Sequence, residues 1–422
     1  MYQRHELSNG IRVVAYPMPG MRSLSLGLWI NAGSAYETME TSGISHFVEH
    51  MLFKGTQTRS AKDLADCVDG IGGQINAFTS KECTSYYIKV LDTHLDIAVE
   101  LLGDMLLNSV HDPVEIEKEK NVILDEIALY EDSPEDVVYD LLAEVIFGRH
   151  PLGFPILGTE ASVRSLSRET VHGLLAARYS AENIVISAAG SYGEEELLRL
   201  LEQHFGTVPR NGAAAADPPL PTFHSAWGIR EKDIEQIHLC VGFEGVRYSD
   251  DDLYPLMVMN NILGGGTSSR LFQSIREDQG LAYSVYSHPS LYKDNGLMTV
   301  YASFIPENLE PVMNSLTEEI RKLRLGQFTE EEILRGKEQL KGNYILGLES
   351  TGSFMSMMGK SELMAGVIET IDEVIEKIDR VSAADVQRMT DRALTPERCA
   401  VALTGRVSDR EGLLAFEKLK TI

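Results

Sequence analysis

Two histidines and a glutamate in the stretch SGISHFVEHMLFKGT are the residues whose types and spacing could do chemistry: His46, Glu49 and His50. Residues four apart lie on the same face of an α-helix, so both imidazoles can offer a nitrogen to one ion. Glu49 lies at the edge of that face. A zinc ion held there would lower the pKa of a water molecule toward about 7, and a neighbouring carboxylate could accept the proton.

The competing interpretation is that these three residues share a helix by coincidence. With 11 histidines in 422 residues, the pattern HxxEH is expected by chance only about 0.02 times in such a chain. A catalytic zinc takes three protein ligands, so a third must come from elsewhere. The acid-rich segment 114–136 offers Glu119 and Glu126, seven residues apart on one helix face. Spacing alone is equally consistent with a solvated helix surface there.

The elements that must position these residues can be predicted from periodicity and turn residues. A helix over 42–54 carries the histidines, with Thr41 or Ser42 as its expected N-cap. The other expected elements are a strand at 23–30, a helix at 61–68, a hairpin of GGQINAFTS (72–80) and TSYYIKV (84–90), and long helices near 92–108 and 113–147. Hairpins beside long helices predict an α+β fold, with an antiparallel or mixed sheet and helices packed mainly on one face.

The chain also repeats itself. Residues 165–190 align without a gap on residues 380–405, 215 positions later, and each copy is predicted to be a helix, a turn and a buried strand ending at glycine. The same offset places Gly27 on Gly242. We therefore expect two homologous domains, residues 1–211 and residues 224–422. An exposed linker rich in alanine and proline, residues 212–223, joins them.

The second copy lacks the chemistry of the first. At the repeat offset the HxxEH triplet falls on three other residues: Asn261, Gly264 and Gly265. Glu126 falls on Lys341 or Asn343, depending on a small gap. If the triplet were needed to build the fold, both copies would need it, so the difference favours chemistry and predicts one metal ion per chain.

Composition narrows the class of partner. The chain is 43% hydrophobic and 24% charged, which is typical of a soluble globular protein. A net charge of -25 argues against nucleic acid or an anionic membrane as a partner. No apolar run approaches the roughly 18 residues of a membrane span. The four cysteines lack CxxC spacing, and we expect idle thiols in a cytoplasmic protein: Cys67, Cys83, Cys240 and Cys399.

HxxEH is the inverse of the thermolysin motif, and nearly the whole chain resembles the inverzincin metalloproteases, the family of pitrilysin, insulin-degrading enzyme and mitochondrial processing peptidase. The resemblance implies a zinc endopeptidase. The family places a glutamate ligand about 76 residues after the second histidine, which here is Glu126. It also implies Glu49 as general base and Glu119 as an assisting catalytic group near the metal.

The resemblance extends to substrate-binding elements. GGQINAFTS resembles the family strand that pairs with an extended peptide, which implies that Asn76, Ala77 and Phe78 contact the substrate. SRLFQSIREDQGLAYSVYS (269–287) resembles the segment with a substrate-binding arginine and tyrosine, here Arg276 and Tyr283. The tyrosine hydroxyl would also stabilise the oxyanion. GGGTSSR (264–270) resembles the glycine-rich loop of the non-catalytic processing subunit.

In size the chain resembles the short, processing-peptidase-like branch of the family, and most of all its bacterial members. A closed chamber needs four domains, so the resemblance implies a homodimer in which the partner's C-terminal domain completes the site. The expected reaction is cleavage of short or unfolded peptides by metal-activated water. Two alternatives stay open: a non-catalytic subunit, although such subunits have typically lost part of HxxEH, and the catalytic half of a heterodimer.

Overall fold

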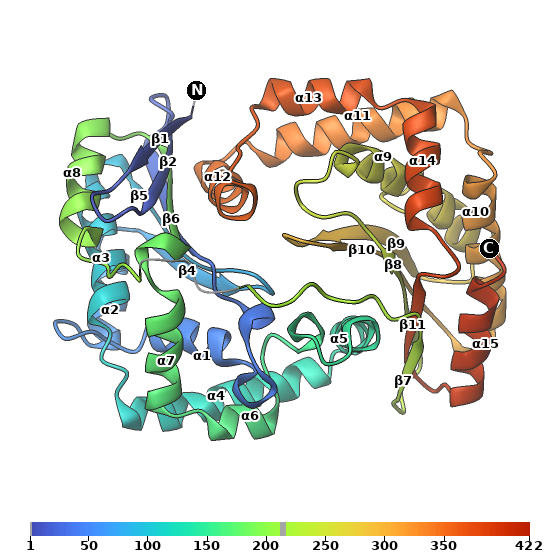
Figure 1. Cartoon of the computed structure of the whole chain (residues 1–422), viewed down its shortest axis with the longest axis horizontal. Helices are drawn as coiled ribbons and strands as arrows, with labels where there is room; N and C mark the ends of the chain where they lie inside the picture. Colours follow the sequence, from blue (N-terminus) through green and yellow to red (C-terminus); the bar gives the residue numbers. More distant parts are fainter. Residues whose placement is uncertain (1, 212–216) are drawn as a thin grey trace. The chain divides into compact units, whose positions relative to one another are not determined.

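The computed structural model describes residues 2–211 and 217–422. The chain forms two compact units, each built on one β-sheet (Figure 1). Unit 1 comprises Met1–Ala128, Phe154–Pro219 and Gly347–Ile368, and unit 2 comprises Leu129–Gly153, Leu220–Leu346 and Glu369–Ile422. Residues 212–216 of the predicted linker lie outside the described residues, and residues 217–223 contain no helix or strand.

The sheet of unit 1 has six strands in the order β1-β2-β6-β3-β5-β4. The strands are β1 (Gln3–Glu6), β2 (Arg12–Pro17), β3 (Ser23–Ile30), β4 (Gln74–Thr79), β5 (Thr84–Leu91) and β6 (Ile184–Gly190). β2 and β6 are parallel and all other neighbours are antiparallel, so the sheet is mixed. Alternate residues of β3, such as Leu24 and Leu26, enter the core beneath the helices because successive side chains of a strand point to opposite faces.

The helices of unit 1 cover mainly one face of this sheet. They are α1 (Ile44–Met51), α2 (Ala61–Gly70), α3 (Leu95–Asn108), α4 (Pro113–Glu131), α6 (Glu160–Ser165), α7 (Arg168–Arg178), α8 (Glu194–Phe205) and α12 (Thr351–Ala365). Short 3₁₀ helices lie at η1 (Ser34–Tyr36), η2 (Met39–Thr41), η3 (Asp92–His94) and η5 (Ala181–Asn183).

Unit 2 has a five-stranded sheet in the order β7-β11-β8-β10-β9, again mixed because β7 and β11 are parallel. Its strands are β7 (Trp227–Glu231), β8 (Ile237–Glu244), β9 (Ser284–Leu291), β10 (Gly296–Phe304) and β11 (Cys399–Gly405). Its helices are α5 (Pro134–Phe147), α9 (Leu253–Leu263), α10 (Leu309–Arg324), α11 (Glu330–Gly347), α13 (Ile371–Arg380), α14 (Ala383–Ala393) and α15 (Asp409–Leu419), with a π-helical segment η6 (Phe272–Asp278) and 3₁₀ turns η4 (Pro151–Gly153) and η7 (Pro306–Asn308). The predicted α+β class is confirmed in both units.

The long helix predicted over 113–147 is wrong in one respect, because it is two helices. α4 ends at Glu131 and α5 begins at Pro134. Pro134 has no backbone N–H to continue a helix, and the Ser133 side chain accepts a hydrogen bond from the Asp136 N–H as the N-cap of α5. The break matters because α4 belongs mainly to unit 1 and α5 to unit 2.

The predicted repeat over 165–190 and 380–405 is confirmed. α7 and α14 begin 215 residues apart, as do β6 and β11. Both strands end at a glycine with positive φ, +133° at Gly190 and +137° at Gly405.

The predicted match of Gly27 with Gly242 is wrong by two residues. Gly27 pairs with Ser187, and the equivalent partner in unit 2, Ala402, pairs with Cys240. By strand register Gly242 therefore corresponds to Trp29. A shift of two keeps the same face of the strand, so the side-chain alternation in the sequence cannot reveal it.

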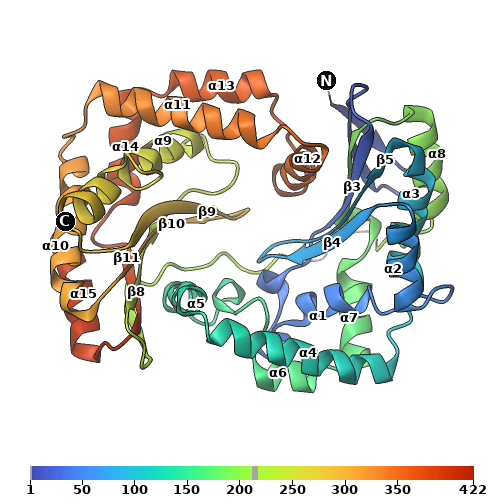
Figure 2. The same ribbon diagram turned by 180° about the vertical axis from the view of Figure 1, so that it is seen from behind.

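Each unit includes one helix from the other half of the chain. α12 packs on β3 and β6 of unit 1, and α5 packs on β8 and β11 of unit 2, on the face opposite the main helical layer. Figures 1 and 2 show this by colour, with orange α12 beside blue and green strands and teal α5 beside yellow and red strands. α5 and α12 begin 217 residues apart, close to the repeat offset. The two compact units are therefore not identical to the two halves of the sequence, because these two segments belong to the unit of the other half.

Two further observations concern the whole described chain. All four cysteines are free thiols, and three of them are buried. Among the described residues, no helix is both long enough and apolar enough to cross a bilayer.

Candidate metal centre

The centre is built on α1, whose start differs from the prediction. The N-cap is Gly43, with φ +89°, instead of Thr41 or Ser42. A Cβ at Gly43 would lie 2.5 Å from the backbone oxygen of Leu157, so only glycine fits. The Glu37 carboxylate accepts hydrogen bonds from the N–H groups of Gly43 and Ser45, at 2.7 and 2.8 Å. Burial raises the pKa of Glu37 to about 7, and the two N–H donors act in the opposite direction.

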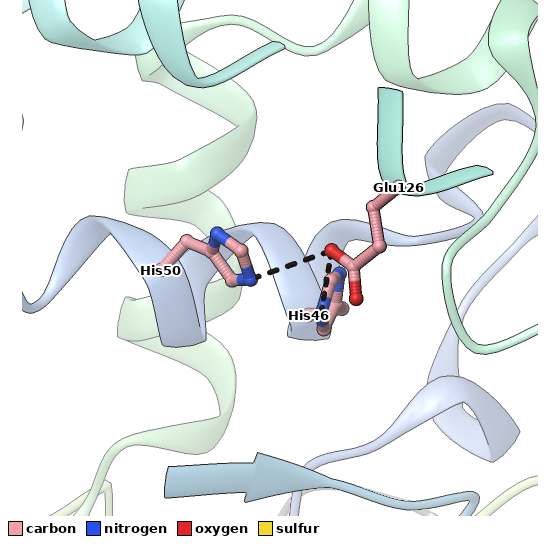
Figure 3. A group of neighbouring side chains, drawn as sticks. All are labelled: His46, His50 and Glu126. Carbon is pink, nitrogen blue, oxygen red and sulfur yellow. Dashed lines mark ion pairs between the residues drawn. The ribbon is translucent and has the colours of Figure 1, made fainter. Parts of the chain in front are cut away.

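Three side chains from α1 and α4 converge beside the sheet of unit 1 (Figure 3). Nε2 of His46 lies 3.7 Å from Oε2 of Glu126, and Nε2 of His50 lies 3.8 Å from the same oxygen. Ligand atoms bound tetrahedrally at about 2.0–2.2 Å from zinc are about 3.3–3.6 Å apart. Small side-chain adjustments would therefore let this group hold a divalent ion. Across the described residues it is the one group of three or more histidine, cysteine or acidic side chains with all ligand atoms within 4.8 Å.

Glu119, on the same face of α4 as Glu126, orients His50. One carboxylate oxygen accepts a hydrogen bond from Nδ1 of His50 at 2.8 Å, and the other lies 2.6 Å from Nζ of Lys54. Burial opposes ionisation of Glu119, but these two contacts outweigh it and lower its pKa. Because a carboxylate only accepts, Nδ1 of His50 carries a proton, and Nε2 is the nitrogen that faces Glu126.

The two imidazoles have different surroundings. Burial lowers the pKa of His46 to about 3, so its ring is neutral and able to ligate. Its Nδ1 is buried and has no hydrogen-bond partner among the described residues. Burial would also lower the pKa of His50, but the hydrogen bond to Glu119 and the charges around it raise it overall. Metal binding at Nε2 of His50 would therefore compete with a proton.

Glu49 lies beside the three ligand candidates. Its Oε2 accepts a hydrogen bond from Oγ1 of Thr79 at 2.6 Å. Burial raises the pKa of Glu49, partly offset by this hydrogen bond. Since Thr79 is the last residue of β4, the contact ties the helix of the histidines to the edge strand of the sheet.

The three predicted substrate-binding residues on β4 lie at that edge. Asn76, Ala77 and Phe78 occupy the strand, which pairs with β5 on one side and has no neighbour on the other within the described sheet. Phe78 is 37% exposed, and its ring packs edge-on against Trp29 at a centroid distance of 5.6 Å. No strand pairs with the outer edge of β4 in the described sheet, and the Ala77 N–H donates a hydrogen bond to the Asn76 side-chain oxygen at 2.8 Å.

Arg276 and Tyr283, the other predicted substrate contacts, belong to unit 2. Arg276 lies on η6 and Tyr283 directly precedes β9. The guanidinium carbon of Arg276 is 5.0 Å from the centre of the Tyr283 ring, which is a cation–π contact. Tyr283 is 73% exposed, so its hydroxyl is free to meet a ligand.

The sequence did not single out three residues that contact the centre or the start of its helix: Glu37, Lys54 and Thr79. Lys54 follows His50 by four residues, and Thr79 directly follows Phe78, so both had a local signal. Glu37 had none, because its contacts depend on a fold of the chain between η1 and α1.

The structure has two repeated α+β units. In unit 1, two histidines of one helix and a carboxylate are placed to hold a divalent ion, and these are the features of a two-domain metalloprotein. Family models narrow this further. Residues 12–160 match "Insulinase (Peptidase family M16)" and residues 165–340 match "Peptidase M16 inactive domain". The chain belongs to peptidase family M16, which confirms the resemblance seen in HFVEH.

Relatives of similar length support this placement. The chain is 44% identical over 403 residues to the uncharacterized zinc protease YmxG of Bacillus subtilis, covering 96% of this chain and 98% of that protein. It is 38% identical over 414 residues to an uncharacterized zinc protease of Mycobacterium leprae, covering 97% and 93%. The chain is thus a short, two-domain member of the family.

Solved structures show the same fold at lower identity. A protease from Helicobacter pylori superposes with a TM-score of 0.90 at 21% identity, covering 96% of this chain and 99% of that one. A Pseudomonas fluorescens structure described as a peptidase M16 inactive domain gives 0.90 at 19% identity, covering 96% and 98%. A chain of complex III from Candida albicans gives 0.87 at 21% identity, covering 99% of both. These likenesses concern the fold alone.

Proposed function

We propose that this protein is a zinc-dependent endopeptidase that cleaves short or unfolded peptides. The observation that supports it most is the convergence of His46, His50 and Glu126 on one point, with Glu49 on the same helix. The names of the bacterial relatives, which call them zinc proteases, agree with zinc as the ion. One ion per chain is expected, because unit 2 lacks an equivalent group among its described residues.

In this proposal each side chain has a defined task. His46, His50 and Glu126 are the ligands, and Glu119 keeps Nε2 of His50 directed at the ion. A zinc ion held there would polarise the peptide carbonyl and lower the pKa of a water molecule. Glu49 accepts a proton from the attacking water and later delivers it to the leaving amine nitrogen. Thr79 donates a hydrogen bond to Oε2 of Glu49, so we assign the proton transfer to Oε1.

The substrate is held as an added strand along β4. Main-chain groups of Asn76, Ala77 and Phe78 would pair with the peptide, which explains how many sequences could be accepted. Arg276 would bind a peptide carbonyl, and the Tyr283 hydroxyl would stabilise the oxyanion. For a chain of two domains we propose a homodimer, with Arg276 and Tyr283 completing the partner's site. The cytoplasmic location stays a prediction.

The deciding experiment compares Glu49→Gln with the wild type on a quenched fluorescent peptide library, with zinc content measured on both. We expect Glu49→Gln to keep its zinc and to lose activity by at least about 100-fold, since general acid–base groups contribute about 10²–10⁴-fold. Asp125→Asn is the matched control, because Asp125 is an exposed acid adjacent to a ligand candidate. A Glu49→Gln enzyme with full activity would refute the assignment of the base.

A second function class is a non-catalytic or heterodimeric subunit of a processing-peptidase-like assembly. This class is favoured by one observation: residues 165–340 match a family model that is described as an inactive domain. In that case the purified wild type would bind zinc yet cut no peptide of any tested length. Sizing by light scattering separates the homodimer from a monomer awaiting another chain.

A further inference from the structure

Glu37 is a buried acid that the proposed mechanism does not use. It is 4% exposed, and both of its carboxylate oxygens are occupied by backbone N–H groups of Gly43 and Ser45. Burying a carboxyl group is costly unless it gains specific hydrogen bonds. Both bonds are made at the start of α1, which carries the candidate zinc ligands.

α1 cannot supply this cap from its own N-cap residue. The first N–H groups of a helix have no intrahelical partner and are normally satisfied by a serine, threonine or aspartate side chain. In unit 1, α2 is capped in that way by Ser60 and α7 by Ser167. The N-cap of α1 is Gly43, where the close backbone of Leu157 excludes any side chain. Glu37, six residues earlier in the chain, takes over the task.

The first turn of α1 matters because it carries His46. His46 is the third residue of the helix, and its imidazole has no hydrogen bond at Nδ1 to orient it. Its position therefore depends on the backbone of this turn and on packing. His50, one turn later, is oriented separately by its hydrogen bond to Glu119.

We propose that Glu37 is a remote cap of α1 and acts as a positioning residue for the metal group, by holding the first helical turn so that Nε2 of His46 faces Glu126. The metal part of this proposal rests on the proposed function. Groups that orient a ligand through a second contact typically change metal affinity by about 10–100-fold when removed. The cap itself is a property of the metal-free protein and can be tested without zinc.

The test uses Glu37→Gln, which keeps the shape but replaces one acceptor oxygen with an NH₂ group that cannot accept from an N–H. Hydrogen–deuterium exchange over residues 37–51 is measured in the metal-free protein, and the zinc dissociation constant is measured by chelator competition. We expect faster exchange in the first turn of α1 and a zinc affinity about tenfold lower.

Ser60→Ala is the matched control, because it removes the side-chain cap of α2 in the same unit. It should lower thermal stability by a similar amount and leave zinc affinity unchanged. Equal losses of zinc affinity in both variants would reduce the effect to general stability and overturn the proposal, as would unchanged affinity and exchange in Glu37→Gln. If Glu37→Gln does not fold, Glu37→Asp takes its place, because its side chain is too short to reach both N–H groups. It must then show faster exchange and a lower zinc affinity than Ser60→Ala.

Failure of the proposed function has a different signature. If the wild type binds no zinc, the endopeptidase proposal fails, whereas the exchange of residues 37–51 still decides whether Glu37 caps α1. If zinc binds and the peptide assay is silent, the affinity comparison between Glu37→Gln and Ser60→Ala remains valid.

Discussion

The two sheets solve the same packing problem with opposite residues. In unit 1, β3 supplies the large Trp29, and α12 passes it with Gly359, where a Cβ would lie 2.1 Å from the indole nitrogen. In unit 2, the register-equivalent strand residue is Gly242, and α5 covers it with Leu142 and Ile146. Leu142 and Gly359 are 217 residues apart, like the starts of α5 and α12. The large side chain is on the strand and the glycine on the helix in unit 1, and the reverse holds in unit 2.

This reversal indicates that the fold requires one small residue where the helix passes the strand. Either the helix or the strand can provide it. Close-packed interiors fix total volume more tightly than residue identity. The two halves have thus diverged in sequence while they keep the same exchanged helix.

The same comparison applies to the chemistry. Where α1 carries its histidines, α9 of unit 2 leads into a glycine segment whose backbone is engaged: Gly264 N–H donates to Asn260 and its oxygen accepts from Ser287 N–H. A Cβ at Gly264 would lie 2.5 Å from Oγ of Ser287. Backbone contacts fill this region in unit 2, whereas side chains converge in unit 1.

The largest expected effect concerns metal content. We expect mass spectrometry to find one zinc ion per wild-type chain. Glu126→Ala should lower the zinc affinity by more than the roughly 10–100-fold that is typical when a group outside the ligand set is removed. Asn343→Ala, at the matching helix of unit 2, should keep full zinc content. Two ions per wild-type chain would show that unit 2 also binds metal and would break the comparison.

The next effect tests whether the two units are equivalent where their sequences agree. A Cβ at Gly190 would lie 2.4 Å from the Ser23 oxygen, and one at Gly405 would lie 2.7 Å from the Gln236 oxygen. Both glycines have a φ that side chains rarely tolerate. Gly190→Ala and Gly405→Ala should each lower the free energy of unfolding of their own unit by about 3 kcal/mol.

Each unit contains one tryptophan, which makes this measurement specific. Trp29 lies in unit 1 and Trp227 in unit 2, and there are two tryptophans in the chain. Urea unfolding is therefore followed by fluorescence in single-tryptophan variants, each against its own parent. Strongly unequal losses would show that the repeat does not extend to these strand ends.

A smaller difference should separate the two helix crossings. Gly359→Ala places a methyl group against the rigid indole of Trp29, which also donates a hydrogen bond to Ser187. Gly242→Ala meets only the flexible ends of Ile146 and Leu142. We expect the free energy of unfolding to fall by about 2 kcal/mol in Gly359→Ala and by about 1 kcal/mol in Gly242→Ala.

The control for these two variants is Gly352→Ala. Gly352 lies on the same helix as Gly359, and its Cβ would meet no atom closer than 3.8 Å. This change should be neutral or stabilising, since alanine favours a helix more than glycine does. A similar loss in Gly352→Ala and Gly359→Ala would mean that α12 itself, and not its contact with Trp29, sets the cost.

Local pattern was enough to predict the parts of the site that lie within one element. The spacing of His46 and His50 on a helix requires only the helical period, and alternation gave the strands of the hairpin. Glu126 came from the family resemblance, because helix spacing did not distinguish it from Glu119. Contacts between distant segments could not be predicted from the chain alone.

The wrong predictions share that cause. Thr41 or Ser42 was the expected cap of α1, but the backbone of Leu157 lies so close that glycine is required there. Gly27 was aligned with Gly242 because no local signal reports a two-residue shift in strand register. The exchange of α5 and α12 depends on which sheet each helix covers, and an apolar helix face does not specify its partner.

The smallest expected effect concerns the connection that precedes the long helix in each unit. His111 precedes α4 with φ 47°, and Gly326 precedes α11 with φ 68°. Burial, with neighbouring positive groups in support, lowers the pKa of His111 to about 4. Below the ordinary histidine pKa of about 6.5 the unfolded chain gains a proton that the folded chain refuses, so stability falls as pH drops from about 6.5 toward 4.

His111→Asn should flatten this acid dependence in unit 1, because asparagine tolerates positive φ and does not titrate. We expect the wild type to lose about 1 kcal/mol more than the variant between pH 7 and pH 5, after allowance for partial solvent screening. Urea midpoints followed through Trp29 give the comparison. Parallel pH profiles for the two proteins would mean that His111 accepts its proton in the folded state, and that the residue at this connection is chosen for backbone conformation alone, as glycine is in unit 2.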